Sequence, residues 1–135
     1  SLLSLIAPFS LIDGSSSVAK TTVAAVLAEL GTFGTYRHKD DGYFGGGRWP
    51  LLSCFLGLAL IETGDTVKAS EILNWIETLT NENLELPEQL ESPLLFPEMR
   101  AEWIARWGEP AIPLLWSHAM YLSLASALKM DSGKE

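Results

Sequence analysis

The chain has few of the residues that form cross-links, metal centres and phosphate-binding surfaces. A single cysteine, Cys54, excludes an internal disulfide, and two histidines among scattered carboxylates show no metal-ligand spacing. Cys54 lies in an apolar run, so we expect a buried structural thiol and no metal site. Nine lysines and arginines against seventeen acidic residues give a net charge of −8, with no basic run. We therefore expect no nucleic-acid partner.

Long hydrophobic runs are also missing. The longest apolar stretch, 51–61, falls well short of the roughly 18 residues that suggest a membrane span. The apolar N-terminal segment, 1–9, lacks a positively charged start and is interrupted by Pro8. The sequence thus predicts neither a membrane partner nor a signal peptide. Together with the lone cysteine, these absences favour a cytoplasmic location.

The residues that are present suffice for one folded unit. A length of 135 residues corresponds to a single domain, and 47% hydrophobic with 19% charged residues excludes disorder. The glycines of 45–47 lack the preceding strand and the following Lys-Ser/Thr of a phosphate loop, so we expect no nucleotide and no other cofactor.

Hydrophobic residues recur at helical spacing in most of the chain, and no alternating run long enough for a strand is present. The class is therefore predicted to be all-α. The expected helices follow N-caps at 15–17 and stop at Gly31, run from Pro50 to about Thr63, follow Asp65 with Ala69, Ile72, Leu73 and Ile76 on one stripe, run from Pro97 to Trp107, and run from Leu114 to Leu128. The Gly64-Asp65 link predicts an antiparallel hairpin, and residues 130–135 are expected to form a frayed tail.

Two long loops separate these helices, at 35–49 and at about 82–113. The second contains five of the seven prolines, and a loop of this length in a compact domain is usually functional or disordered. Its tryptophans, Trp103 and Trp107, argue against disorder. Both loops leave the C-terminal end of one helix and lead to the start of another, so in a barrel of antiparallel pairs they would open onto one rim.

The first loop has the composition of a sugar-binding site. Aromatic rings stack on the apolar faces of sugars, and Arg and Asp side chains bind hydroxyls, as Arg37, Asp41, Tyr43 and Trp49 could. A plain surface turn is the alternative. In the second loop, Pro87 gives Glu88 a rigid start, and Gln89 places an amide beside that carboxylate.

Three segments together resemble the C-terminal part of glycoside hydrolase family 15, the glucoamylase and glucodextranase family. They are the substrate-loop-like segment 36–54, which contains Asp-Gly-Tyr-Phe-Gly-Gly-Gly-Arg-Trp-Pro, the Leu-Pro-Glu-Gln segment 86–89, and the Pro-Leu-Leu-Trp-Ser-His-Ala segment 113–119. Their order and separation also agree with the family over nearly the whole chain.

The resemblance implies a six-hairpin (α/α)6 barrel that cleaves α-glucosidic bonds of oligosaccharides or glucans from non-reducing ends with inversion. It implies Glu88 as general base. The substrate-binding positions that it implies are Arg37, Asp41, Tyr43, Trp49, Gln89 and Trp116, the last as the wall beneath the scissile bond.

Inversion also needs a carboxylic acid about 6.5 to 9.5 Å from the base, and nothing in this chain matches the family's acid segment. The resemblance therefore implies that residues 1–135 are a single unit, the C-terminal portion of the catalytic domain, which requires the rest of the barrel as a partner. An isolated piece should be inactive and should expose apolar faces of the helices at 50–63 and 114–128.

Other interpretations remain open. A non-catalytic carbohydrate-binding or regulatory module with the same fold, similar to the large regulatory subunits of phosphorylase kinase, is the main alternative. A tetratricopeptide scaffold ranks third, because no second copy of the 56–69 pattern follows at a 34-residue offset. A catalytic triad at Ser117-His118 is disfavoured, and we expect His118 to be a helix residue with a satisfied hydrogen bond.

Overall fold

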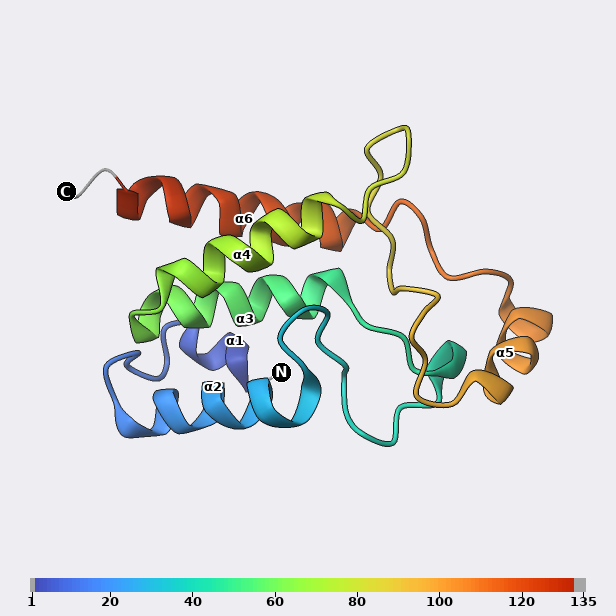
Figure 1. Ribbon diagram of the computed structural model, residues 1–135, viewed down its shortest axis with the longest axis horizontal. Helices are drawn as coiled ribbons and strands as arrows, with labels where there is room; N and C mark the ends of the chain where they lie inside the picture. Colours follow the sequence, from blue (N-terminus) through green and yellow to red (C-terminus); the bar gives the residue numbers. More distant parts are fainter. Residues whose placement is uncertain (1, 133–135) are drawn as a thin grey trace.

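The computed structural model describes residues 2–132, and these are almost entirely helical and loop (Figure 1). The elements are α1 (Leu3–Ile6), α2 (Ser17–Leu30), the 3-10 turn η1 (Tyr43–Gly45), α3 (Pro50–Thr63), α4 (Thr66–Glu77), the 3-10 turn η2 (Pro97–Met99), α5 (Arg100–Trp107) and α6 (Leu115–Ser132). Within the described residues the extended pairing is one isolated antiparallel bridge, Thr35 with Trp49. The all-α prediction is confirmed.

The helix ends follow the local signals that predicted them. The Ser16 side chain caps α2 by accepting a hydrogen bond at 3.1 Å from the N–H three residues on, and Asp65 does the same for α4 at 3.0 Å. Pro50 opens α3. Gly64, at φ +95°, ends α3 in the left-handed region and turns the chain directly into α4, which gives the expected antiparallel hairpin.

Helix α3 forms the centre of the molecule. It packs against α4 and α6 on one side and against α1 and α2 on the other (Figure 1). Ten of its fourteen residues are buried, because its sequence is apolar nearly all round. The core therefore covers the face of 50–63 that was expected to be exposed, and that expectation is wrong.

Two further details differ from the sequence prediction. Helix α6 continues to Ser132, because no helix breaker follows Leu128 before Gly133; the expected tail is wrong for residues 130–132, and 133–135 lie outside the described residues. The short helix α1 has no cap or periodicity signal, and it forms because Leu3 and Ile6 are buried against the rest of the core.

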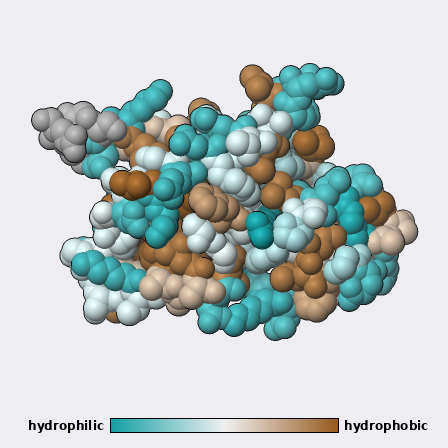
Figure 2. All heavy atoms as spheres, in the orientation of Figure 1, coloured by the Kyte–Doolittle hydropathy of each residue, from teal (hydrophilic) through white to brown (hydrophobic). Residues whose placement is uncertain are grey.

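The outward face of α6 exposes several apolar side chains. Met120 and Leu124 point into the core, whereas Leu115 is 82% and Leu122 is 62% exposed. Other hydrophobic side chains also reach the surface among the polar ones, as the brown areas of Figure 2 show. The expectation of an exposed apolar face is thus confirmed for α6.

Both long loops lie at the same end of the helical layers, as predicted (Figure 1). The segment 35–49 meets 88–96 there, and α5 packs on η1. The candidate residues of the two loops are therefore neighbours in space.

Candidate active site

Main-chain hydrogen bonds join the two loops into one frame. Leu90 N–H donates to the carbonyl of Arg48 at 2.8 Å, and the N–H groups of Leu95 and Phe96 donate to the carbonyls of Gly46 and Gly45 at 3.2 and 2.9 Å. These bonds do not depend on side-chain identity. They place Glu88 beside the glycine-rich turn.

The glycines of this turn are required by close approach. Gly46 adopts φ +72°, and a Cβ there would lie 2.0 Å from the carbonyl oxygen of Asp41. A Cβ on Gly47 would lie 2.2 Å from the carbonyl oxygen of Leu90. The glycine run, which alone predicted little, is therefore the contact surface between the loops.

Arg37 and Asp41 form a two-point ion pair at the centre of the first loop. The guanidinium donates from Nε to Oδ2 at 2.8 Å and from Nη2 to Oδ1 at 2.5 Å, and the N–H of Tyr43 donates to Oδ1 at 3.1 Å. Burial opposes the ionisation of Asp41, which is 1% exposed, but the bonds from Arg37 and Tyr43 outweigh it and hold the pKa of Asp41 below its usual value. Asp41 is thus a buried carboxylate that stays ionised.

The Arg37 guanidinium also lies over two aromatic rings. Its central carbon is 4.7 Å from the ring centre of Tyr43 and 5.3 Å from that of Trp49. The two rings are stacked with centres 6.1 Å apart. The structure therefore brings all four predicted residues of the first loop into one cluster.

Glu88 closes this cluster from the second loop. Tyr43 Oη donates to Glu88 Oε1 at 3.2 Å, and the N–H of Ala111 donates to Oε2 at 3.1 Å. The N–H of Glu88 donates in turn to the carbonyl of Ala111 at 2.8 Å. Each carboxylate oxygen is thus held by one donor, and each keeps a lone pair for a water molecule. Burial and the nearby Glu88 charge raise the pKa of Tyr43, which keeps its phenol a donor.

The other two predicted residues lie differently. Gln89 is 2% exposed, and its amide serves the loop frame, accepting from the N–H of Gly47 at 2.8 Å and donating to the carbonyl of Tyr43 at 3.4 Å. Trp116 lies in the first turn of α6, is 57% exposed and packs edge-on against Phe55. Contact of either residue with a sugar stays a prediction.

The sequence reasoning did not identify every residue of the cluster. Trp103 of α5 packs edge-on against Tyr43, with ring centres 4.9 Å apart, and lies 5.7 Å from Phe44. The helical spacing of Trp103 does not predict its contact with Tyr43, because that contact depends on how the second loop folds back onto the first. The indole N–H of Trp49 is buried without a hydrogen-bond partner in the described part of the chain.

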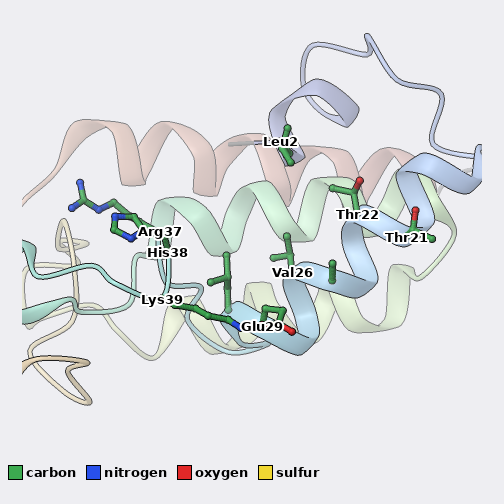
Figure 3. A pocket seen from close by; sticks show the side chains of 10 residues that line it. Leu2, Thr21, Thr22, Val26, Glu29, Arg37, His38 and Lys39 are labelled. Carbon is green, nitrogen blue, oxygen red and sulfur yellow. Dashed lines mark ion pairs between the residues drawn. The ribbon is translucent and has the colours of Figure 1, made fainter.

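A hollow lies between α2 and the start of the first loop, and Arg37 is one of its lining residues. It has a volume of about 520 Å³ and is lined by polar and apolar side chains of α2, together with Leu2 and 37–39 (Figure 3). Lys39 reaches Glu29 across it as an ion pair, while Arg37 extends away from α2 (Figure 3). Of the residues that line this hollow, Arg37 also belongs to the Glu88 cluster, whereas Glu88 and Asp41 lie outside the lining.

Two features found in many other proteins do not occur in residues 2–132. These residues contain no group of three or more His, Cys, Asp or Glu side chains arranged to hold a metal ion. None of their helices has the length and apolarity needed to cross a membrane. Cys54 is buried, and burial raises the pKa of its thiol to about 12.

Comparison with known proteins identifies relatives of this arrangement. No protein-family model matches the sequence. An isomaltose glucohydrolase of Kribbella flavida is 46% identical over 129 residues, which are 95% of this chain and 34% of that protein. An uncharacterized glycosyl hydrolase of Methanocaldococcus jannaschii is 31% identical over an alignment of 139 positions that covers 90% of this chain and 20% of that protein.

A solved wild-type glycosidase superposes with a TM-score of 0.91 at 46% identity, over 95% of this chain and 35% of that one. A glutamate-to-alanine variant of a glycosidase in complex with glucose matches with the same TM-score at 45% identity. The chain is homologous to part of a glycosidase. Its fold is that of part of an α/α-barrel glycosidase, as predicted, and it spans about a third of the length of the Kribbella relative.

Proposed function

We propose that the protein carrying this chain is an inverting glucoside hydrolase of glycoside hydrolase family 15 in which Glu88 is the general base. Residues 1–135 form the C-terminal portion of its catalytic domain. The observation that carries the proposal is the fixed Glu88 carboxylate, held at 3.2 Å by Tyr43 beside the Arg37–Asp41 pair. A carboxylate with one free lone pair on each oxygen can orient and deprotonate a water molecule.

The surrounding residues suit the terminal glucose of an oligosaccharide. The partly exposed ring of Tyr43, stacked on the buried Trp49, offers an apolar surface, and the exposed part of Arg37 offers donors to hydroxyl groups. Trp116 supplies a further exposed ring for the sugar. Gln89 contributes to sugar binding by holding the main chain of Tyr43 and Gly47 in position. A neutral sugar needs no cationic surface, which agrees with the net charge of −8.

The substrate we propose is a short α-glucoside, with isomaltose as the first compound to test, because the relative with 46% identity is an isomaltose glucohydrolase. The general acid lies outside the described cluster. Asp41 does not serve, since both its oxygens accept hydrogen bonds from Arg37 and it stays ionised. The rest of the barrel is proposed to supply the acid and the remaining sugar contacts.

Proton NMR of the full-length protein with isomaltose and with maltose tests this proposal. We expect release of β-glucose from at least one of them, because inversion converts the α-linkage to the β-anomer. Glu88→Gln should lower kcat by about three or more powers of ten and leave glucose binding within about twofold, since the amide cannot accept the proton. Glu91→Gln is the matched control, because Glu91 lies three residues on, is 80% exposed and bonds only to Arg100 among the recorded contacts.

Near-normal turnover by Glu88→Gln would end the assignment of the base. Release of α-glucose would exclude inversion. Glucan binding by the wild-type protein without turnover would favour the carbohydrate-binding or regulatory module over the enzyme.

A further inference from the structure

The two residues that precede Glu88 are bonded to the first turns of α6. The N–H of Leu86 donates to Nε2 of His118 at 3.0 Å, and Oγ of Ser117 donates to the carbonyl of Pro87 at 2.9 Å. The N–H of Leu114, just before α6, donates to the carbonyl of Leu86 at 2.9 Å. The expectation that His118 has a satisfied hydrogen bond is thus confirmed, but its partner is the main chain next to Glu88.

We propose that Ser117 and His118 are positioning residues that fix the Glu88 carboxylate by holding the main chain of Leu86 and Pro87. This inference rests on the proposed role of Glu88 as general base. It assigns to the Ser-His pair of α6 a task distinct from nucleophilic catalysis and from sugar binding.

The main chain that α6 holds leads directly to the Glu88 carboxylate. Leu86 is 2% exposed and anchored in the core, and the ring of Pro87 fixes φ at the residue before Glu88. With both carbonyls and the Leu86 N–H held, the peptide leading to Glu88 has little freedom left. The donors on the far side, Tyr43 and the Ala111 N–H, then meet the carboxylate at hydrogen-bonding distance.

The chemistry of the imidazole makes this contact specific. A main-chain N–H can donate only to a ring nitrogen that carries no proton, so Nε2 is the acceptor and the neutral ring has its proton on Nδ1. Leucine at this position cannot accept the bond. Glutamine can, because its side-chain oxygen reaches about as far as Nε2.

The surroundings of His118 provide a control position. A cavity of about 330 Å³ lies beside the ring, lined on α4 by Ile76 and Glu77 and on α6 by Tyr121. The hydroxyl of Tyr121 donates to Glu77 at 2.8 Å, so the titratable groups facing His118 from α4 and α6 are bonded to each other. Tyr121 lines the same cavity as His118 but has no recorded bond to 86–89.

The experiment compares His118→Leu, His118→Gln and Tyr121→Phe in the full-length protein. Steady-state kinetics with the glucoside that the wild type cleaves should show kcat about ten- to a hundredfold lower in His118→Leu, because misplacement of a reacting group by about 1 Å has an effect of this size. KM should change by less than about twofold, since the base acts mainly in the transition state. His118→Gln should recover most of kcat, and Tyr121→Phe should keep it.

Hydrogen exchange of the peptide covering 84–89 gives a second readout that needs no turnover. The Leu86 amide should exchange faster in His118→Leu than in the wild type, and at close to the wild-type rate in His118→Gln and Tyr121→Phe. If the wild-type protein cleaves no glucoside, the proposed function fails, and hydrogen exchange alone decides whether His118 holds the segment.

Three results would overturn the inference while leaving the function in place. The first is unchanged exchange of Leu86 in His118→Leu. The second is a wild-type kcat in His118→Leu while Glu88→Gln is inactive. The third is equal loss of activity in His118→Gln, His118→Leu and Tyr121→Phe, which would show a general loss of folding.

Discussion

The buried Asp41 carboxylate fixes the conformation of the first loop and also contributes a negative charge to the candidate site. It accepts two bonds from Arg37 and one from the N–H of Tyr43, and so closes a turn of the first loop on itself. Because Arg37 is 37% exposed at its side chain, solvent weakens this pair relative to a fully buried one. The pair is therefore important mainly for the conformation of the loop.

Asp41→Asn tests this at the residue scale. The pKa of Asp41 in the folded protein lies below the ordinary value of 3.8, so the unfolded state binds more protons around that pH. The contribution of the ionised Asp41 to the free energy of unfolding is therefore present above about pH 4. It is lost as the pH falls through the pKa of the folded state. We expect Asp41→Asn to lower Tm at pH 7. The difference from the wild type should shrink as the pH is lowered toward 3.

Thermal unfolding of the full-length protein between pH 7 and pH 3 checks this prediction. Asp40→Asn is the control, since Asp40 is the exposed neighbour and surface substitutions usually change stability by less than about 0.5 kcal/mol. A Tm difference for Asp41→Asn that stays constant with pH would contradict it.

At the scale of elements, the crossing of α3 and α6 depends on a missing side chain. A Cβ on Gly57 would lie 2.8 Å from one methyl carbon of Leu124 and 2.9 Å from the other. Leu124 is fully buried, so it has no free space into which it can turn. The two helices approach closely because α3 has glycine at this position.

Gly57→Ala should therefore destabilise the protein. The overpacking should cost about 1–3 kcal/mol of stability. Replacing a helical glycine by alanine gains up to about 1 kcal/mol, so the net effect is a loss. Leu124→Ala should cost about 2–5 kcal/mol by leaving a cavity. In the double variant the added methyl fills part of that cavity, so the loss should be smaller than the sum of the two single losses, as measured by thermal unfolding. A loss in the double variant equal to the sum of the two single losses would show that the side chains at positions 57 and 124 are not in contact.

Most of the helix ends could be predicted from the sequence, because the signals that determine them are local. The cap at Ser16 and the stop at Gly64 act within one turn of the helix ends that they specify. Helix α1 could not be predicted, since four residues with no cap form a helix only because Leu3 and Ile6 are buried. In the site, the ion pair of the first loop is local, whereas the bond from Tyr43 to Glu88 joins residues 45 positions apart. No spacing rule predicts such a contact, and the resemblance to a known family implied only that both residues belong to one site.

At the scale of the whole molecule, the outer face of α6 and the Glu88 carboxylate, which has no ion pair among the recorded contacts, lead to the same conclusion. The face exposes Leu115, Trp116 and Leu122, which a folded protein usually covers. Among the recorded contacts of the cluster, Glu88 is the one carboxylate not taken by Arg37. Both features agree with a chain that spans about a third of the length of its Kribbella relative.

We therefore expect residues 1–135, prepared alone, to release no glucose from isomaltose, maltose or longer maltooligosaccharides, because the other carboxyl group of the described Glu88 cluster, Asp41, is ionised and paired with Arg37 and cannot protonate the leaving oxygen. The exposed face of α6 should bind a hydrophobic dye more strongly than the same mass of full-length protein does. Glucose analysis and dye fluorescence check the two statements. Glucose release by the isolated chain would refute the first.

The frame of the site is made largely of main-chain hydrogen bonds, and this affects how the protein can evolve. The bonds from Leu90, Leu95 and Phe96 to the first loop are made by groups that every residue except proline possesses. Side chains of the candidate site can therefore be exchanged by mutation without breaking the main-chain bonds that join the two loops. A lineage that carries this frame can vary the side chains of the candidate site, while Gly46 and Gly47 leave no room for a Cβ.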